Sequence, residues 1–221
     1  PERASDAIER RQLAHEEWLA RRAVARFFPQ VIPVASDRRN ALYYVQTWHE
    51  GQTLAQALEG GRHFTVPEVL AIGIKLSRGI GALHRRSIIH RDIKPANVHL
   101  GKDEEVRILD LGVAESGLAA GMLTARAGTP SFLAPELIAG GAASWQTDLY
   151  ALGVTLYYAI TRRYPYGEVE PFQRPRFGDP APPSRYRPDS PQWFENLILK
   201  LVAKEPRERF ETAEELILAL E

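Results

Sequence analysis

Residues 90–97, His-Arg-Asp-Ile-Lys-Pro-Ala-Asn, carry the side chains of this chain that are best suited to chemistry. Asp92 could accept the proton of an attacking hydroxyl, and Lys94 could offset charge that develops on a transferring phosphate. Asn97 and Asp110 offer oxygen atoms of the kind that Mg²⁺ prefers, with water and phosphate as its other ligands. These residue types are the equipment needed to pass a phosphoryl group from a nucleotide to a hydroxyl.

Two predicted elements must hold these residues in place. Thr65 and Glu68 form a capping box with proline between them, and apolar residues then recur at helical spacing to about His84. This pattern predicts a long buried helix that delivers the chain to residues 90–97. Beyond them, residues 98–109 have the pattern of a hairpin that leads into Asp110.

The spacing of apolar residues also predicts the rest of the secondary structure. Further helices are expected over residues 4 to about 26, 148–160, 191–202 and 212–220, and strands over residues 31–34 and 41–48. The helix over 148–160 is apolar on most sides and should be central. Residues 162–190 hold too many prolines for a continuous helix.

Composition narrows the class of protein. The 221 residues include 28 basic and 28 acidic side chains, so no general basic field would attract nucleic acid. The chain has no cysteine, and no apolar run approaches the roughly 20 residues that span a bilayer. We therefore expect a cytoplasmic domain with no membrane segment in this chain. Its first residue is Pro1 rather than Met, so we expect a fragment of a longer protein.

The order of the motifs adds a resemblance. H-R-D-x-K-P-x-N, then D-x-G, then A-P-E is similar to the signature of the protein kinase family, over residues 4–221. It implies an α+β fold with a mostly helical C-lobe over residues 49–221. Residues 1–48 would be a partial N-lobe with an αC-like helix and about two strands.

Finer features point to a subgroup of that family. Lys94 is typical of the serine/threonine class, and the chain resembles bacterial members. Residues 16–22 and 164–187 resemble kinase domains fused behind a PP2C-type phosphatase. The missing N-terminal part would then include a phosphatase, and a membrane anchor after Glu221 would place the domain at the cytoplasmic face of a membrane.

One part of the kinase pattern is absent. Kinases carry a glycine-rich loop and a strand lysine before the αC-like helix, and residues 1–15 supply neither. Truncation of the small lobe is the favoured interpretation, and a domain without a normal phosphate clamp is the alternative. The resemblance makes Glu17, or else Glu16, the partner of the missing lysine, although either could be an ordinary solvated glutamate.

The same resemblance assigns a nucleotide site. Gln46, Thr47 and His49 would form the hinge that meets the adenine edge, unless this segment is only the exit of a strand. His99 falls where kinases place an apolar residue beneath the adenine ring, and it could instead face the adjacent solvent. Leu111 replaces the commoner phenylalanine of the metal-binding triplet and keeps an apolar plug there.

The remaining assignments concern regulation and support. Residues 110–136 would be the activation segment, with Thr124 as the first choice for phosphorylation and Thr129 as a contact of the catalytic loop. Arg91 and Arg126 would bind the phosphate group. Supporting roles are implied for four further residues. They are His90 packed inward, Asp148 holding the catalytic loop or simply capping its helix, and Glu136 paired with Arg209.

The leading functional prediction is a serine/threonine protein kinase that uses ATP and Mg²⁺ to phosphorylate protein hydroxyls. Its partners would be a protein substrate and a fused or cognate PP2C-type phosphatase, without nucleic acid. We expect this fragment alone to be inactive, because half of the nucleotide clamp is absent. The alternatives are a pseudokinase that works as a binding or allosteric module and, third, a small-molecule kinase of related fold.

Overall fold

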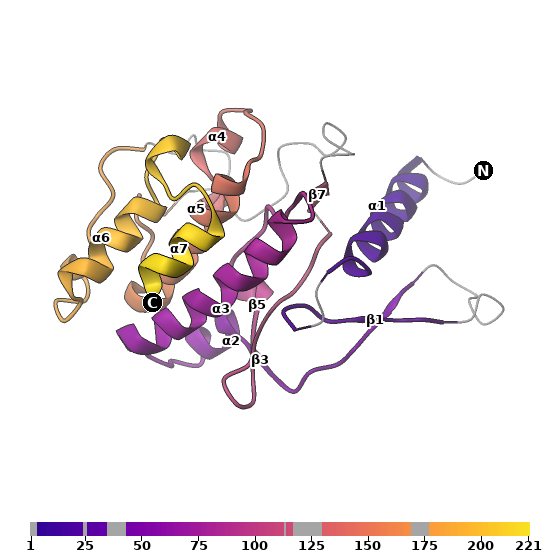
Figure 1. The fold of residues 1–221 in the computed structure, drawn as a ribbon, viewed down its shortest axis with the longest axis horizontal. Coiled ribbons are helices and arrows are strands. Elements are labelled where there is room, and N and C mark those ends of the chain that lie inside the picture. Colours follow the sequence, from indigo (N-terminus) through magenta and orange to yellow (C-terminus); the bar gives the residue numbers. More distant parts are fainter. Residues whose placement is uncertain (1–3, 24–25, 35–42, 113, 117–129, 169–176) are drawn as a thin grey trace.

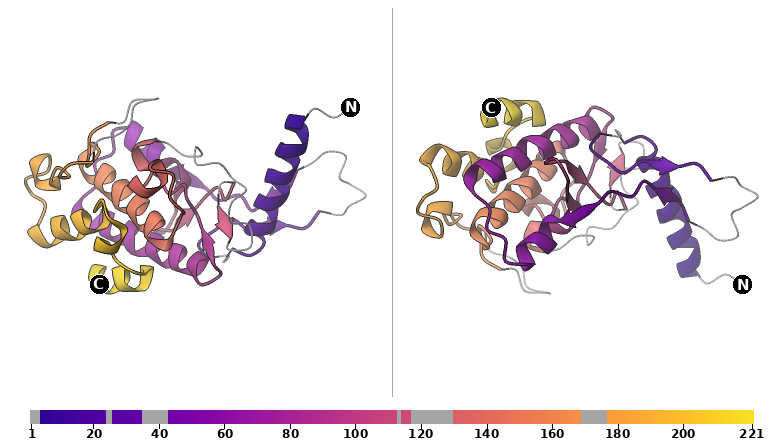
Figure 2. Two further views of the ribbon diagram at one scale, coloured as in Figure 1. Left: turned by 90° about the horizontal axis from the view of Figure 1, so that it is seen from above. Right: turned by 90° about the horizontal axis from the view of Figure 1, so that it is seen from below.

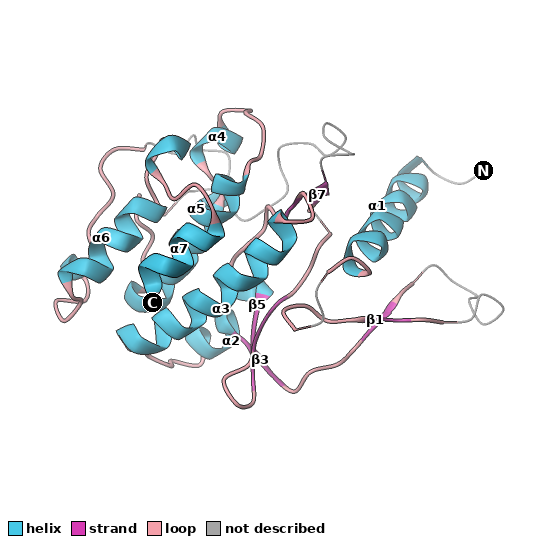
Figure 3. Ribbon diagram, in the orientation of Figure 1, coloured by secondary structure: helices cyan, strands magenta, loops and turns pink. Residues whose placement is uncertain are grey.

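The computed structural model describes residues 4–23, 26–34, 43–112, 114–116, 130–168 and 177–221. Most helices gather in one body, while helix α1 (Ala4–Ala20) and strand β1 (Val31–Ile32) lie at the end of the molecule opposite helix α6 (Gln192–Leu201) (Figures 1 and 2). The architecture is therefore mainly helical, with small two-stranded and three-stranded sheets beside the helices (Figure 3).

Helix α1 is shorter than the sequence pattern predicts, because it ends at Ala20 rather than near Arg26. Its last turn closes with hydrogen bonds from the backbone of Arg22 and Ala23 to the Leu19 carbonyl. The chain then turns away, and the Phe27 carbonyl accepts a hydrogen bond from the backbone of Ile108 at 2.8 Å. This long-range bond attaches the end of α1 to the main body.

The two predicted N-terminal strands are present in shortened form. β1 pairs antiparallel with β2 (Val45–Gln46), so Val31 lies opposite Gln46. The backbone N–H of Thr47 donates to the Gln30 carbonyl at 2.8 Å and extends this pairing by one bond. The connection over residues 35–42 lies outside the described part of the chain.

A three-stranded sheet connects residues 90–97 to Asp110. Its strands are β3 (Gly51–Thr53), β5 (Val98–Gly101) and β6 (Val106–Ile108), with β5 in the middle. The β5–β6 pair is the hairpin predicted before Asp110. A second pairing joins β4 (Ile88–Ile89) to β7 (Glu115–Ser116), so the segments that flank residues 90–112 run side by side.

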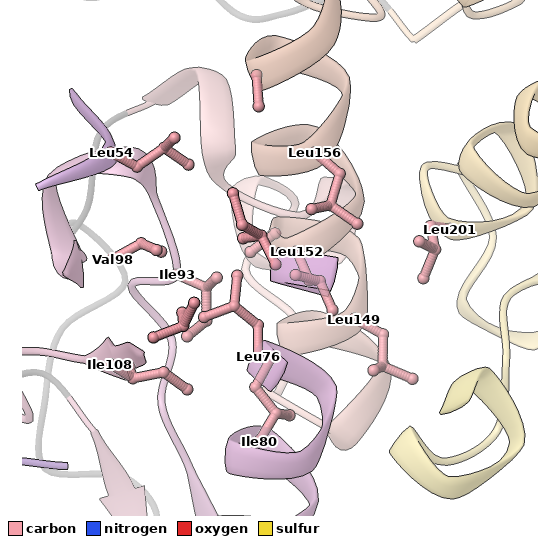
Figure 4. Close-up of a cluster of buried hydrophobic side chains, with 14 of the residues drawn as sticks. Leu54, Leu76, Ile80, Ile93, Val98, Ile108, Leu149, Leu152, Leu156 and Leu201 are labelled. Atoms are coloured by element: carbon pink, nitrogen blue, oxygen red, sulfur yellow. The ribbon is translucent and has the colours of Figure 1, made fainter. Parts of the chain in front are cut away.

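Helix α3 (Val66–His84) forms as predicted, with the reciprocal hydrogen bonds of the capping box between Thr65 and Glu68. It packs against α5 (Trp145–Thr161), which starts earlier than predicted because Ser144 is its N-cap. Figure 4 shows the leucines and isoleucines of α3, α5 and the sheet pointing into one apolar core. The core holds both helices beneath residues 90–97.

The other helices in the described ranges are α2 (Leu54–Glu59), α4 (Pro135–Ile138), α6 (Gln192–Leu201) and α7 (Ala213–Leu220), with short 3₁₀ turns at Pro95–Asn97, Pro130–Phe132, Pro183–Arg185 and Pro206–Glu208. Of these, α7 packs against α3 and α6 packs against α5. Between α5 and α6 the contact is close at Gly153, where an added Cβ would lie 2.5 Å from the Cβ of Leu201. None of the helices in the described ranges has the length and apolar character needed to cross a membrane.

Candidate active site

Asp92, Lys94 and Asn97 meet in the loop between β4 and β5. Lys94 Nζ lies 2.7 Å from Asp92 Oδ2. Asn97 Nδ2 donates to the same carboxylate oxygen and to the Asp92 carbonyl, both at 2.9 Å. Asp92 is buried, so these partners replace the water that would otherwise solvate its charge. The carboxylate thus keeps a fixed position beside an ammonium group.

Asp148 fixes the backbone of this loop by accepting two of its backbone hydrogen bonds. Its Oδ1 accepts the backbone N–H of Arg91 at 2.8 Å, and its Oδ2 accepts that of His90 at 2.9 Å. Arg91 has a φ of +68°, a left-handed conformation that needs support in a residue with a side chain. Asp148 lies inside helix α5 rather than at its cap, so it holds the loop, and the alternative of a simple cap is wrong.

His84 is a part of this arrangement that sequence reasoning missed. Its Nε2 donates to Asp148 Oδ2 at 2.8 Å, and its ring stacks on Trp145 with a centroid separation of 5.5 Å. Burial alone would raise the pKa of Asp148, but the hydrogen bonds from His84 and the His90 backbone bring it below its usual value. Asp148 therefore remains an anionic acceptor for the loop.

His90 is fully buried and packs inward, where the sequence analysis expected it. Its Nε2 donates to the Leu109 carbonyl at 3.2 Å, and its Nδ1 accepts the Asp92 backbone N–H at 3.3 Å. Burial lowers the pKa of His90, which agrees with a neutral ring that donates on one side and accepts on the other. The ring links the Asp92 loop to the strand before Asp110.

Asp110 begins a tight turn next to Asn97. The Leu109 backbone donates to the Asn97 carbonyl at 2.8 Å, which joins the two segments directly. Asp110 has a φ of +61°, and its Oδ1 accepts the Gly112 backbone N–H at 2.8 Å. We call residues 110–112 the Asp110 turn. The Asp110 side chain is exposed, unlike the buried Asp92.

Helix α1 presents Glu16, rather than Glu17, to this turn. Glu17 bonds Arg21 one helical turn later, at 2.7 Å. Glu16 accepts a hydrogen bond from the Tyr44 hydroxyl, and its other oxygen lies 3.5 Å from where a Cβ on Gly112 would be. The sequence could not separate these neighbours, because the choice depends on how the helix is rotated against the Asp110 turn.

The predicted hinge residues lie at the end of β2. The Thr47 hydroxyl accepts the Gln30 backbone N–H at 2.9 Å and is hydrogen-bonded to His49 Nε2 at 3.0 Å. Gln46 is exposed and reaches the Tyr44 hydroxyl at 3.3 Å. Trp48 projects outward with 88% of its surface exposed. Thr47 and His49 are thus held together, while their neighbours face outward.

His99 does not face solvent, because only 8% of its surface is exposed. The ring hydrogen-bonds the His49 backbone, and its centroid is 6.4 Å from that of His49. Gly51, at a φ of +144°, packs closely against the His99 ring, because a Cβ added to Gly51 would lie only 2.8 Å from His99 Cε1. Burial and the nearby Arg107 lower the pKa of both histidines, which favours neutral rings at neutral pH.

Glu136 and Arg209 form the predicted long-range pair. Two parallel hydrogen bonds of 2.9 and 2.8 Å join the guanidinium to the carboxylate, and the Arg209 side chain is fully buried. The guanidinium also donates to the carbonyls of Ala203, Gln146 and Lys204. Thr124 and Thr129, the predicted activation-segment residues, lie outside the described residues.

A groove of about 390 Å³ opens beside Lys94. It is lined by residues of α2, including Leu58 and Glu59, and by Tyr158 and Tyr164, whose rings stack with centroids 4.9 Å apart. Lys94, the ion-pair partner of Asp92, also lines it. A segment of another chain that entered the groove would therefore meet Lys94.

Comparison with known proteins identifies the class to which this fold and site belong. Residues 5–218 match the model of the protein kinase domain, so the chain belongs to the protein kinase family. The predicted kinase-like α+β fold is thus confirmed. Among the residues that the structure describes, no group of three or more His, Cys, Asp or Glu side chains could hold a metal ion.

Three curated relatives show which members are similar. The chain is 32% identical to the probable serine/threonine-protein kinase SCO3848 of Streptomyces coelicolor over 84% of its length, which is 28% of that relative. It is 32% identical to the serine/threonine-protein kinase PrkC of Bacillus subtilis, over 85% of this chain and 30% of the relative. The inactive serine/threonine-protein kinase PLK5 of Mus musculus is 35% identical over 77% of the chain and 29% of the relative.

The chain thus spans less than a third of the length of these relatives. The predicted similarity to bacterial serine/threonine kinases is confirmed. The predicted fusion to a PP2C-type phosphatase is not tested by these similarities and stays a prediction.

Proposed function

We propose that this chain carries the catalytic loop and the C-lobe of a serine/threonine protein kinase that transfers the γ-phosphoryl group of ATP to protein hydroxyls. The observation that carries the proposal is the contact of Asp92 with Lys94 at 2.7 Å in a loop held by Asp148. Asp92 would accept the proton of the substrate hydroxyl, and Lys94 would stabilise charge on the transferred phosphoryl group. Lys94 lines the groove that would receive the substrate.

The donor set fits Mg²⁺ at Asn97 and Asp110. Because Asp92 already engages Asn97 Nδ2, the carbonyl oxygen of that side chain is the atom left for a cation. Asp110 adds one exposed carboxylate on the adjoining turn, and a hard cation that keeps water and phosphate ligands needs few protein oxygens. When bound, the ion would neutralise phosphate charge.

The hinge would bind the adenine. The Thr47 hydroxyl and the His49 ring brace each other, so their backbone groups have a fixed direction. His99 supports this segment from within the sheet. In this proposal residues 1–48 belong to an N-lobe and residues 49–221 form the C-lobe, with the nucleotide between them. Glu16, which faces the Asp110 turn, replaces Glu17 as our candidate partner for the nucleotide-binding lysine.

Several features of the whole protein remain proposals. Its substrates would be proteins, and a PP2C-type phosphatase would be a fused or cognate partner. Thr124 would be a phosphosite with Arg91 as a phosphate ligand, and Thr129 would contact the catalytic loop. We also keep the prediction of a cytoplasmic location.

Replacement of Asp92 by Asn in the intact polypeptide tests the central assignment. The exchange preserves shape but removes the base, so phosphorylation of a general protein substrate should fall by roughly 10²–10⁴-fold. Affinity for Mg²⁺–ATP, measured by calorimetry, should change little. The matched control is Asp103→Asn, the same change at an exposed residue with positive φ, and it should retain full activity.

Full activity of the Asp92→Asn protein would overturn the assignment of the base. A noncatalytic binding module is the second candidate, since one relative is named inactive. An intact protein that binds a partner but transfers no phosphate, with or without the Asp92 substitution, would favour that module.

A further inference from the structure

Tyr44 makes an unusual contact across the part of the molecule where the nucleotide would bind. It stands just before β2, and its hydroxyl donates to Glu16 Oε1, 28 residues away on α1. The side chain is partly buried. Burial and the Glu16 carboxylate raise the pKa of Tyr44, so the phenol keeps its proton and remains a donor at physiological pH. The bond links α1 to the strand that leads to the hinge.

The far side of Glu16 faces the Asp110 turn. A Cβ added to Gly112 would lie 3.5 Å from Glu16 Oε2 and 3.0 Å from Asp110 Oδ1. The two carboxylates therefore flank the same glycine, and their like charges repel each other. Next to Glu16, His15 donates to the Ala114 carbonyl at 3.3 Å, which attaches α1 to the chain beyond the turn.

These contacts leave Glu16 with one clear anchor among the described residues. Its neighbour Glu17 is engaged by Arg21 of the same helix and cannot exchange roles without rotation of α1. Without a donor on Oε1, repulsion from Asp110 would favour movement of the Glu16 carboxylate away from the turn. A hydroxyl from Tyr44 opposes that movement, because a hydrogen bond to a charged acceptor is stronger than one between neutral groups.

We propose that Tyr44 is a positioning residue that holds Glu16, and with it helix α1, against the Asp110 turn, and so sets the affinity for Mg²⁺–nucleotide. The proposal rests on the proposed function, in that the Asp110 side of the cleft is the nucleotide site. Tyr44 itself touches no reacting group in this scheme. It acts through the place that it gives to the Glu16 carboxylate.

A double-mutant cycle in the intact polypeptide tests the coupling. Tyr44→Phe should weaken Mg²⁺–ATP binding about tenfold, the typical effect of losing a hydrogen bond to a charged group. Glu16→Ala should weaken it at least as much, because it also removes the proposed partner of the nucleotide-binding lysine. The double variant should bind no more weakly than Glu16→Ala alone, because Tyr44 acts only through the Glu16 carboxylate. The control is Tyr43→Phe, the same change at the adjacent residue, which should leave the affinity unchanged.

Hydrogen exchange of the α1 backbone gives a readout that does not require nucleotide. Exchange of the amides of residues 17–20 should accelerate about tenfold in Tyr44→Phe and stay unchanged in Tyr43→Phe. Additive losses of affinity in the cycle, or unchanged exchange in Tyr44→Phe, would overturn the role of Tyr44. If the unmodified protein failed to bind Mg²⁺–ATP while exchange in Tyr44→Phe accelerated, the proposed function would fail, and the role of Tyr44 would be limited to holding α1.

Discussion

At the scale of single residues, the site depends on buried polar groups whose partners come from distant parts of the chain. Asp148 is the clearest case, since it accepts hydrogen bonds from the backbones of His90 and Arg91 and from the side chain of His84. A buried carboxylate with three donors fixes the conformation of a loop more firmly than apolar packing does, because each lost bond leaves an unsatisfied group. The position of Asp92 therefore depends on Asp148.

Replacement of Asp148 by Ala should be strongly destabilising. The change leaves two backbone N–H groups and His84 without their acceptor inside the core, so the free energy of unfolding should fall by about 3 kcal/mol or more. Urea unfolding followed by circular dichroism would measure the change. The control is Asp189→Ala, which removes an exposed partner of Arg187 and should have little effect. Equal midpoints for the two variants would contradict this account of the loop.

The sequence predicted a site in which Asp92, Lys94 and Asn97 lie together, and they do so because their relative positions are set within one short segment. Asp92, Lys94 and Asn97 lie within six residues, so local backbone geometry brings them together. The sequence could not predict that His84 contacts Asp148 or that Tyr44 contacts Glu16, since the two partners of each contact are more than 25 residues apart in the chain. The choice between Glu16 and Glu17 stayed open at the level of sequence for the same reason.

At the scale of elements, α5 is the support on which the site is built. Its inward positions pack against α3, and its start carries Asp148 to the catalytic loop. The sequence predicted α3 closely because a capping box marks its start and apolar spacing marks its length. It placed the end of α1 too far along the chain, because the turn after Ala20 is fixed by the bond between Phe27 and Ile108.

The contact between α5 and α6 should be sensitive to a single methyl group. In Gly153→Ala the added Cβ would lie 2.5 Å from the Leu201 Cβ, so α6 must shift and the free energy of unfolding should fall by about 1–3 kcal/mol. Gly178→Ala is the matched control, because an added Cβ there meets no atom within 4 Å. Thermal unfolding would compare the two variants, and an unchanged midpoint for Gly153→Ala would refute this view of the contact.

At the scale of the whole molecule, one apolar core joins α1 to the helical body. Leu19 and Phe28 belong to the same cluster of buried residues as Leu76 and Leu152. The two predicted lobes thus share packing as well as the nucleotide site proposed between them. Sequence reasoning gave the fold class but not this joint core, which depends on the path of the chain between α1 and β1.

The stability of the whole domain should depend on pH through its buried histidines. Burial lowers the pKa values of His90, His49 and His99 below that of an exposed histidine. The unfolded chain therefore takes up protons first as the pH falls, and the free energy of unfolding should decrease below about pH 6.5. Urea titrations at pH 7.5, 6.5 and 5.5 would measure the slope.

A His99→Phe variant is the internal comparison for that slope. Because it removes one of the three titrating groups, the loss of stability between pH 6.5 and 5.5 should be smaller than in the unmodified protein. Stability that stays constant or rises over this interval would contradict the proposed burial of neutral histidines.

The outward-facing indole of Trp48 has a practical consequence. It is 88% exposed beside the hinge, whereas Trp18, Trp145 and Trp193 are 37–51% exposed. Its fluorescence should therefore be the most accessible to quenchers in water. Because Trp48 lies between Thr47 and His49 in the chain, a change in their backbone on nucleotide binding would alter the emission of this indole, so the protein carries a built-in optical probe that needs no attached dye.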